Sequence, residues 1–283
     1  MSMISSIVVP LDGSAAAERA LPAAAALARA TNATVRLLHV VDEAEGPRLS
    51  PEASRAEELF REYAGERCAT LGLDPGATPV EVRFGSAASE ILAAAEGASC
   101  IVLASHGRGG FHATFIGSVA DKVVRGAELP VLVVPAVEQP VTSFQGKPII
   151  VPLDGSEASA AALPFARELA SLFDSKVTLL QTYTLVAASA AFGMAYYATV
   201  DPATLEEAAM AYLREVAREG EEIVAMLGPA STAIVTVAEE RDAGMVVMAT
   251  GGKGLAKRLI LGSTTDRVLH SIRRPLFIIR PPH

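Results

Sequence analysis

A glycine-rich stretch, residues 105–118 with the sequence SHGRGGFHATFIGS, holds the residues best suited to chemistry. It follows a short apolar run, and nine residues separate Gly107 from Gly117. Glycines let the backbone approach a phosphate closely, and the start of a helix leaves N–H groups pointing outward. Ser118 lies three residues before Asp121, as in a capping box, and so marks a helix start. The stretch therefore predicts a phosphate-binding loop.

A second polar loop, from Pro10 to Ser14, follows the first apolar run. Ligands of parallel sheets bind beyond the carboxyl ends of the strands, where the two loops would meet. Asp12 could accept hydrogen bonds from a ribose or a base, and Val40 could offer backbone groups to a base edge. A structural interpretation is equally open for one half alone: Asp12 and Ser14 cap the first helix, and Gly107 turns the chain.

The chain contains this pattern twice. The sequence VPLDGS at residues 9–14 recurs at residues 151–156, an offset of 142. Gly117-Ser118 recurs as Gly262-Ser263, at an offset of 145. A period this long indicates a duplicated domain, because solenoid repeats run ~20–50 residues. We therefore expect two domains, residues 1–137 and 147–283, joined by a polar linker.

Short β-branched runs alternate with longer helical patterns, which is typical of βαβ units around a parallel sheet. In the first half we expect strands at residues 4–9, 35–41, 80–82, 101–104 and 131–134. We expect helices at residues 15–30, 51–71, 87–96 and 119–126. In the second half only seven residues separate Val237, the end of a β-branched run, from Met245. This spacing predicts that the third helix of the second half is short or absent.

Composition narrows the class of protein. The 283 residues are 51% hydrophobic and 20% charged, which is enough apolar residue to bury a sizeable core. The net charge of −8 argues against a nucleic-acid partner, because binding a polyphosphate backbone needs an excess of cations. Aromatic residues make up only 5% of the chain and tryptophan is absent, so few side chains are available to stack on nucleic-acid bases.

Two further features bear on location and redox chemistry. Cys68 and Cys100 are the only cysteines, and each is interpreted as a small buried hydrophobe rather than half of a disulfide or metal site. The N-terminus carries no basic region of the kind that opens a secretory signal, so we expect a cytoplasmic protein. The Ala-rich segment Leu185–Val200 falls short of a membrane span, and no membrane span is expected.

These motifs together resemble the universal stress protein family. The resemblance rests on VPLDGS after the first strand, LLHVV in the second strand, and Ala104-Ser-His-Gly107 followed by nine residues and Gly117-Ser118. It covers almost the whole chain as two tandem copies. It implies two Rossmann-like, adenine nucleotide alpha hydrolase-like α/β domains, each a five-stranded parallel sheet of order 3-2-1-4-5 with helices on both faces.

The resemblance also implies ATP binding in one subclass, through a Gly-x₂-Gly-x₉-Gly-Ser/Thr signature. The first glycine of this signature falls on Ala104 in the first half and on Ala249 in the second, which departs from the pattern. The ligand expected is ATP, with AMP and ADP as alternatives, carrying Mg²⁺ or Mn²⁺ through its phosphates. The expected contacts are Pro10, Leu11, Asp12, Val40, Ala104, Gly107, Arg108, Gly117, Ser118 and Val119, then Pro152, Leu153, Asp154, Thr182, Ala249, Gly252, Lys253, Gly262, Ser263 and Thr264. We expect the first half to hold the better site.

Other site classes lack their motifs. The loop after the first strand is not Gly-x-Gly-x-x-Gly, and neither a Walker A loop nor a Gly-x-Ser-x-Gly elbow is found. His106 and His112 have no companion cluster with metal-ligand spacing, and His106 is interpreted as a phosphate-loop or packing residue rather than a catalytic base.

Three functions remain open. The first is a nucleotide-binding stress-response module that acts by ligand-dependent assembly or partner binding. The second is a slow ATPase or phosphotransferase, and the third is a nucleotide-independent interaction protein that binds another small ligand near Leu185–Val200. No catalytic residue is assigned.

The closing strands of the two halves are apolar and would otherwise leave unpaired edges. We expect Val131–Val134 and Leu276–Ile279 to pair with each other within one chain, giving a pseudo-twofold unit. Two such chains could still form a homodimer.

Overall fold

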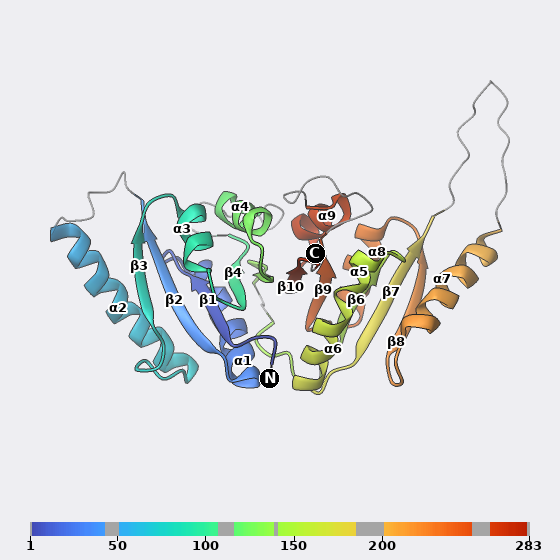
Figure 1. Cartoon of the computed structure of the whole chain (residues 1–283), viewed down its shortest axis with the longest axis horizontal. Helices are drawn as coiled ribbons and strands as arrows, with labels where there is room; N and C mark the ends of the chain where they lie inside the picture. The colour runs from blue at the N-terminus through green and yellow to red at the C-terminus, as the bar shows by residue number, and fades with distance from the viewer. Residues whose placement is uncertain are drawn as a thin grey trace, which may run out of the picture.

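The computed structural model describes residues 2–42, 51–106, 116–138, 141–184, 201–250 and 261–281. Its strands form one ten-stranded sheet in the order β3-β2-β1-β4-β5-β10-β9-β6-β7-β8 (Figure 1). The strands are β1 (Ser6–Pro10), β2 (Thr34–Val41), β3 (Val80–Phe84), β4 (Cys100–Ala104), β5 (Val131–Val134), β6 (Ile149–Leu153), β7 (Val177–Tyr183), β8 (Glu222–Leu227), β9 (Met245–Ala249) and β10 (Leu276–Ile279). Counted within its own half, each set of five strands runs 3-2-1-4-5, and its neighbours pair in parallel.

Helices cover both faces of the sheet. They are η1 (Ala17–Arg19), α1 (Ala20–Thr31), α2 (Pro51–Leu71), α3 (Ala87–Ala94), α4 (Ser118–Gly126), α5 (Glu157–Ala160), α6 (Leu163–Leu172), α7 (Pro202–Val216), α8 (Ala230–Glu240) and α9 (Ser263–Ser271). Successive strand residues point to opposite faces. Val8 therefore belongs to the core cluster that includes residues of α3, α4, α8 and α9, whereas Val9 belongs to the cluster that includes residues of α1, α2, α6 and α7. Because helices cover both faces of the sheet, the strands need apolar residues at successive positions.

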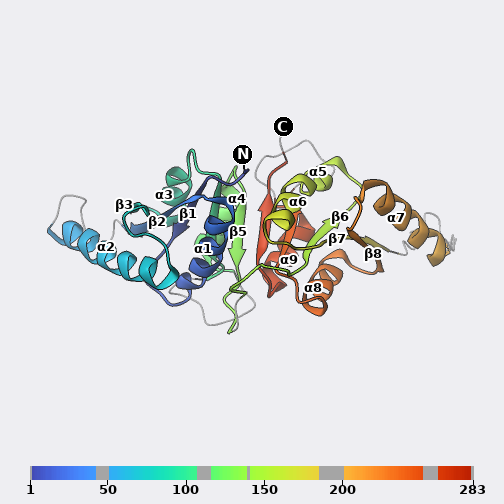
Figure 2. The ribbon, with the colours of Figure 1, turned by 90° about the horizontal axis from the view of Figure 1, so that it is seen from below.

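The two halves join through β5 and β10. These strands pair antiparallel, with Phe277 opposite Leu132, and all eight of their residues are buried. Both hydrophobic clusters of the core therefore run through both halves. The expected pairing of the two closing strands within the chain is present, and Figure 2 shows them side by side between the halves.

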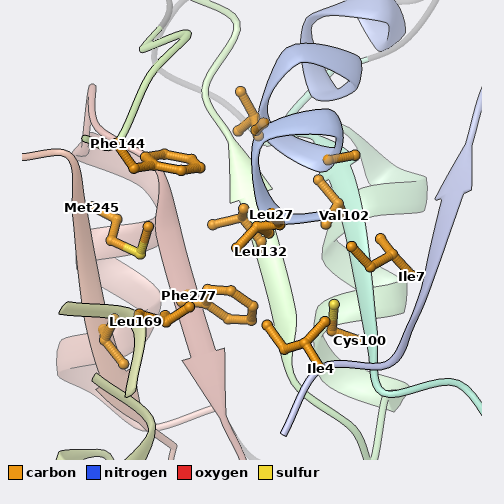
Figure 3. Packing of buried hydrophobic residues seen from close by; sticks show 14 of the residues in the cluster. Ile4, Ile7, Leu27, Cys100, Val102, Leu132, Phe144, Leu169, Met245 and Phe277 are labelled. Atoms are coloured by element: carbon orange, nitrogen blue, oxygen red, sulfur yellow. The ribbon is translucent and has the colours of Figure 1, made fainter. Parts of the chain in front are cut away.

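Phe277 lies at the centre of this junction. Its side chain is fully buried, and its ring meets that of Phe165 edge-on, with 4.8 Å between the ring centroids. Figure 3 shows it beside Leu132 of the first half, and Leu169 of the second half packs in the same core cluster. The core is thus shared by both halves at this point.

The third helix of the second half corrects the sequence-based expectation. α8 spans Ala230–Glu240, which makes it longer than its counterpart α3 (Ala87–Ala94). The β-branched run that ends at Val237 lies inside this helix, where Ala233, Ile234, Val237 and Ala238 form its buried stripe. The preceding strand is β8, and its mixed sequence EIVAML was missed. Tertiary burial outweighed the strand propensity of Ile and Val here.

Two helix starts also differ from expectation. Gly117 and Gly262, rather than Ser118 and Ser263, occupy the N-cap positions of α4 and α9, and neither helix start has a side-chain cap. The first helix is expected from residue 15, whereas a short turn of 3-10 helix, η1, comes first and α1 begins at Ala20.

Phe277→Ala should lower the free energy of unfolding by about 3–5 kcal/mol, because it leaves a cavity where the two halves share their core. Urea unfolding followed by circular dichroism measures this change. The control is Leu59→Ala on α2, where the side chain is 52% exposed and the expected change is about 0.5 kcal/mol or less. If Phe277→Ala lowers the free energy of unfolding no more than the control does, packing at the junction of the two halves does not stabilise the fold as we expect.

Candidate functional site

A cavity of about 470 Å³ lies at the carboxyl ends of β1, β2 and β4, between α3 and α4. Eight of the residues expected at the first site line it: Pro10, Leu11, Asp12, Val40, Ala104, Gly117, Ser118 and Val119. The other two, Gly107 and Arg108, lie outside the described residues.

A second cavity, of about 340 Å³, occupies the corresponding place in the second half. It is lined by Pro152, Leu153, Asp154, Thr182, Ala249, Gly262, Ser263 and Thr264. Gly252 and Lys253 lie outside the described residues. The two loops and the helix start of each half thus come together, although they are far apart in sequence.

The N-terminus of α4 forms one wall of the first cavity. Asp121 donates its backbone N–H to the Gly117 carbonyl at 2.9 Å, which closes the first helical turn. The N–H groups of Ser118, Val119 and Ala120 precede this bond and have no acceptor within the helix. All three residues line the cavity. The second cavity repeats this arrangement, with Asp266 bonded to Gly262 at 2.8 Å.

The backbone conformation at the two N-cap positions does not require glycine. Gly117 has φ −65° and Gly262 has φ −57°, values that any L-residue adopts. A Cβ atom at Gly262 would meet only the Thr265 Oγ1 atom, at an ordinary 3.9 Å. Neither strain nor packing of the described residues accounts for glycine at position 262. A glycine at this position leaves room for a bound group to approach the backbone closely.

Asp12 is oriented at the rim of the first cavity. Its Oδ1 atom accepts hydrogen bonds from the Ser14 backbone N–H at 2.9 Å and from the Ser14 hydroxyl at 2.6 Å. The Ser14 hydroxyl oxygen accepts in turn from the N–H of Ala17, the first residue of η1. The N-cap residues of η1 and α1 are Ala16 and Arg19, and neither helix has a side-chain cap, so the expected capping by Asp12 and Ser14 is wrong in this form. Asp154 and Ser156 make the same pair of contacts in the second half. The bonds from the serine hold each carboxylate in place, and the same aspartate lines its cavity.

The apolar walls of the cavities were not predicted. In the first half they include Leu38, Ala87, Ile91, Leu103 and Ile116. In the second half they include Leu180, Ala230, Ile234 and Met248, with Ser159 and Thr265 as additional polar contacts. One signal was available, because Leu38 lies two residues before Val40 and so shares its face of the strand.

His106 lies in the wall of the first cavity. Its Nδ1 atom is 3.0 Å from the Ser105 hydroxyl oxygen, which accepts a hydrogen bond from the Ala136 N–H. Burial lowers the pKa of His106 below its usual value, so the imidazole is neutral at pH 7. A neutral ring beside a hydroxyl can donate or accept one hydrogen bond.

The cysteines lie outside both cavities and are buried and unbridged. Burial raises the pKa of Cys100 to about 12 and also raises that of Cys68, so neither is a thiolate at neutral pH. Within the described ranges, no group of three or more His, Cys, Asp or Glu side chains could hold a metal ion. No helix in that part of the chain is long and apolar enough to cross a membrane.

Relatives of known name share this sequence over much of its length. A universal stress protein of Mycolicibacterium smegmatis is 27% identical over 291 residues, covering 97% of both chains. One of Mycobacterium tuberculosis is 26% identical over 207 residues, covering 71% of this chain and 68% of that protein.

Solved structures share the fold. The crystal structure of a universal stress protein from Archaeoglobus fulgidus matches with a TM-score of 0.69 at 22% identity, covering 98% of both chains. A putative universal stress protein from Pseudomonas aeruginosa matches with a TM-score of 0.70 at 20% identity, covering 98% of this chain and 94% of that one.

The model of the universal stress protein family matches residues 3–135 and again residues 146–280. These two matches cover nearly the whole chain and coincide with its two sets of five strands. The chain therefore belongs to the universal stress protein family and carries the family's domain twice in tandem.

Proposed function

We propose that this protein binds an adenine nucleotide in the first cavity and that binding changes its assembly or its contact with a partner during stress. The observation that carries the proposal is the N-terminus of α4. A helix start with a glycine N-cap, whose first N–H groups have no acceptor within the helix, opens into a cavity with apolar walls. Helix N-termini bind phosphate through these N–H groups and through the positive end of the helix dipole.

Each part of the nucleotide has a matching part of the cavity. Leu38, Val40 and Ile91 offer an apolar slot for a flat base, and the oriented carboxylate of Asp12 would accept hydrogen bonds from ribose hydroxyls. The N–H groups at residues 118–120 would hold the phosphates. Arg108, as a further phosphate contact, remains a prediction outside the described residues.

A divalent cation would enter with the nucleotide. Mg²⁺ prefers phosphate oxygens, water and one or two protein oxygens to a cage made only of side chains. The described residues fit that mode, because they supply the Ser118 hydroxyl and the Asp12 carboxylate at the cavity but no three-residue metal cluster. Bound Mg²⁺ or Mn²⁺ would neutralise phosphate charge there.

We place the tighter site in the first half. The second cavity is smaller, and it has Thr182 and Thr264 where the first has Val40 and Val119. The lining of the second cavity is therefore more polar at these two positions. Lys253, the cation that would favour phosphate there, remains a prediction outside the described residues.

No specific observation favours the two alternative functions. Hydrolysis of ATP would need an activated water, and among the described residues the histidine in the wall of the first cavity, His106, is buried beside Ser105. The segment Leu185–Val200, expected to take another small ligand, lies outside the described residues.

Isothermal titration with ATP and Mg²⁺ should show binding to the intact chain. Gly117→Ser should weaken binding at the first cavity roughly tenfold or more, because the new side chain fills the phosphate position and its hydroxyl competes for the same N–H groups. Serine is at least as good an N-cap as glycine, so the thermal midpoint should stay equal or rise.

Gly262→Ser is the matched variant at the second cavity, and it should leave the tighter binding step unchanged. If the titration of the unaltered chain with ATP and Mg²⁺ shows no heat of binding, the proposal is wrong. Equal losses in the two variants would contradict the ranking of the cavities.

Acid should destabilise the protein partly through His106. The folded chain keeps this imidazole neutral, whereas the unfolded chain takes up a proton as the pH falls through about 6.5. The unfolded state therefore gains protons that the folded state does not, and stability falls. Urea unfolding at pH 7 and at pH 5 should show a smaller loss of stability in His106→Gln than in the unaltered chain. Identical losses would mean that His106 titrates normally in the folded state.

A further inference from the structure

The helix that forms the phosphate end of the first cavity is held at its other end by the second half of the chain. Arg280 follows β10 and donates three hydrogen bonds to the C-terminus of α4. Its Nε atom bonds to the Ala127 carbonyl at 2.9 Å, and its Nη2 atom bonds to the carbonyls of Arg125 at 2.7 Å and Val124 at 3.1 Å.

These bonds have a clear physical basis. The last carbonyls of a helix have no intrahelical donor, and a cation is favourable at the negative end of the helix dipole. Burial lowers the pKa of Arg280, although a guanidinium remains protonated in proteins. Arg280 is partly buried, and its three hydrogen bonds offset the cost of removing its charge from water, so it ties the second half to this helix end.

A second contact joins the same helix to α9. The Nε atom of Arg125, on α4, bonds to both carboxylate oxygens of Asp121, at 2.9 and 3.0 Å. Its Nη2 atom also bonds to the carboxylate of Asp266, in the first turn of α9. Figure 1 shows α4 and α9 next to each other where the halves meet. One guanidinium thus bridges the first turns of both cavity helices.

The first half does not hold α9 in the way that the second half holds α4. The offset of 145 places Pro135 at the position of Arg280, and proline has no side-chain donor. It places His270 at the position of Arg125, and the Nδ1 atom of His270 lies 2.7 Å from the carbonyl of Asp266 in its own helix. Within the described residues, α9 has no counterpart of the Arg280 anchor. The two cavities therefore differ in how their phosphate-binding helices are supported.

We propose that Arg280 is a positioning residue for the first cavity: by anchoring the C-terminus of α4, the second half holds the N–H groups of residues 118–120 where the phosphates bind. This inference rests on the proposed nucleotide binding. A rigid helix transmits a displacement at one end to the other, and small displacements of a binding group cost affinity. The anchor acts on the phosphates and not on the base, which packs against strands and α3.

The test uses the full chain with Gly262→Ser, so that binding at the first cavity is observed. Affinity for ATP with Mg²⁺ and for adenosine is measured by ligand-observed NMR. Adding Arg280→Met should weaken ATP about tenfold, within the range typical of coupled sites, and change adenosine less than about twofold. Methionine keeps the apolar stem of the side chain. The matched control is Arg273→Met, which removes the same charge from an exposed position in the same half and should change neither affinity.

Asp266→Asn provides a second variant that leaves Arg280 in place and removes the negative charge that pairs Arg125 with α9. It should weaken ATP by a smaller factor and leave adenosine unchanged. Unchanged ATP affinity in both variants, with ATP binding intact in the parent, would overturn the inference while the proposed function stands. Equal weakening of ATP and adenosine would show that Arg280 only stabilises the fold. A parent that binds neither ligand would overturn both proposals.

Discussion

The antiparallel pairing of β5 with β10 is the constraint on which the rest of the molecule depends. Each of these strands is the last of its half, and each is buried along its whole length. Their pairing removes two apolar edges and makes one sheet of ten strands. It also brings together the two helices that precede these strands, α4 and α9, which begin at the two cavities. A single pairing thus joins the cores and sets the two helices of the candidate sites against each other.

The candidate sites use the backbone more than side chains. Glycine at each N-cap leaves room beside N–H groups that the helix itself cannot satisfy, and parallel strands surround that point with apolar walls. The positive end of the α4 dipole also faces the first cavity. An acidic chain with a net charge of −8 can therefore offer a local site for phosphate.

Much of the candidate site could be predicted because its residues recur at a constant spacing. The loop at Asp12 and the helix start at Gly117 each appear twice, and duplication separates such residues from chance glycines and aspartates. The apolar walls could not be predicted in the same way, since Leu38 and Ile91 are ordinary core residues until the helices are placed. α8 was missed because its buried stripe contains Ile234 and Val237, which favour strands when burial is unknown. The contacts of Arg280 join residues about 155 positions apart and depend on the pairing of the halves.

The central claim is that phosphates bind at the N-terminus of α4. Backbone amide NMR of the full chain tests it most directly, with ATP and adenosine added separately in the presence of Mg²⁺. The account predicts that the amide resonances of Ser118, Val119 and Ala120 shift strongly with ATP and little with adenosine, whereas resonances along Leu38 and Val40 shift with both. ATP binding that leaves the three α4 amides unmoved would contradict the account.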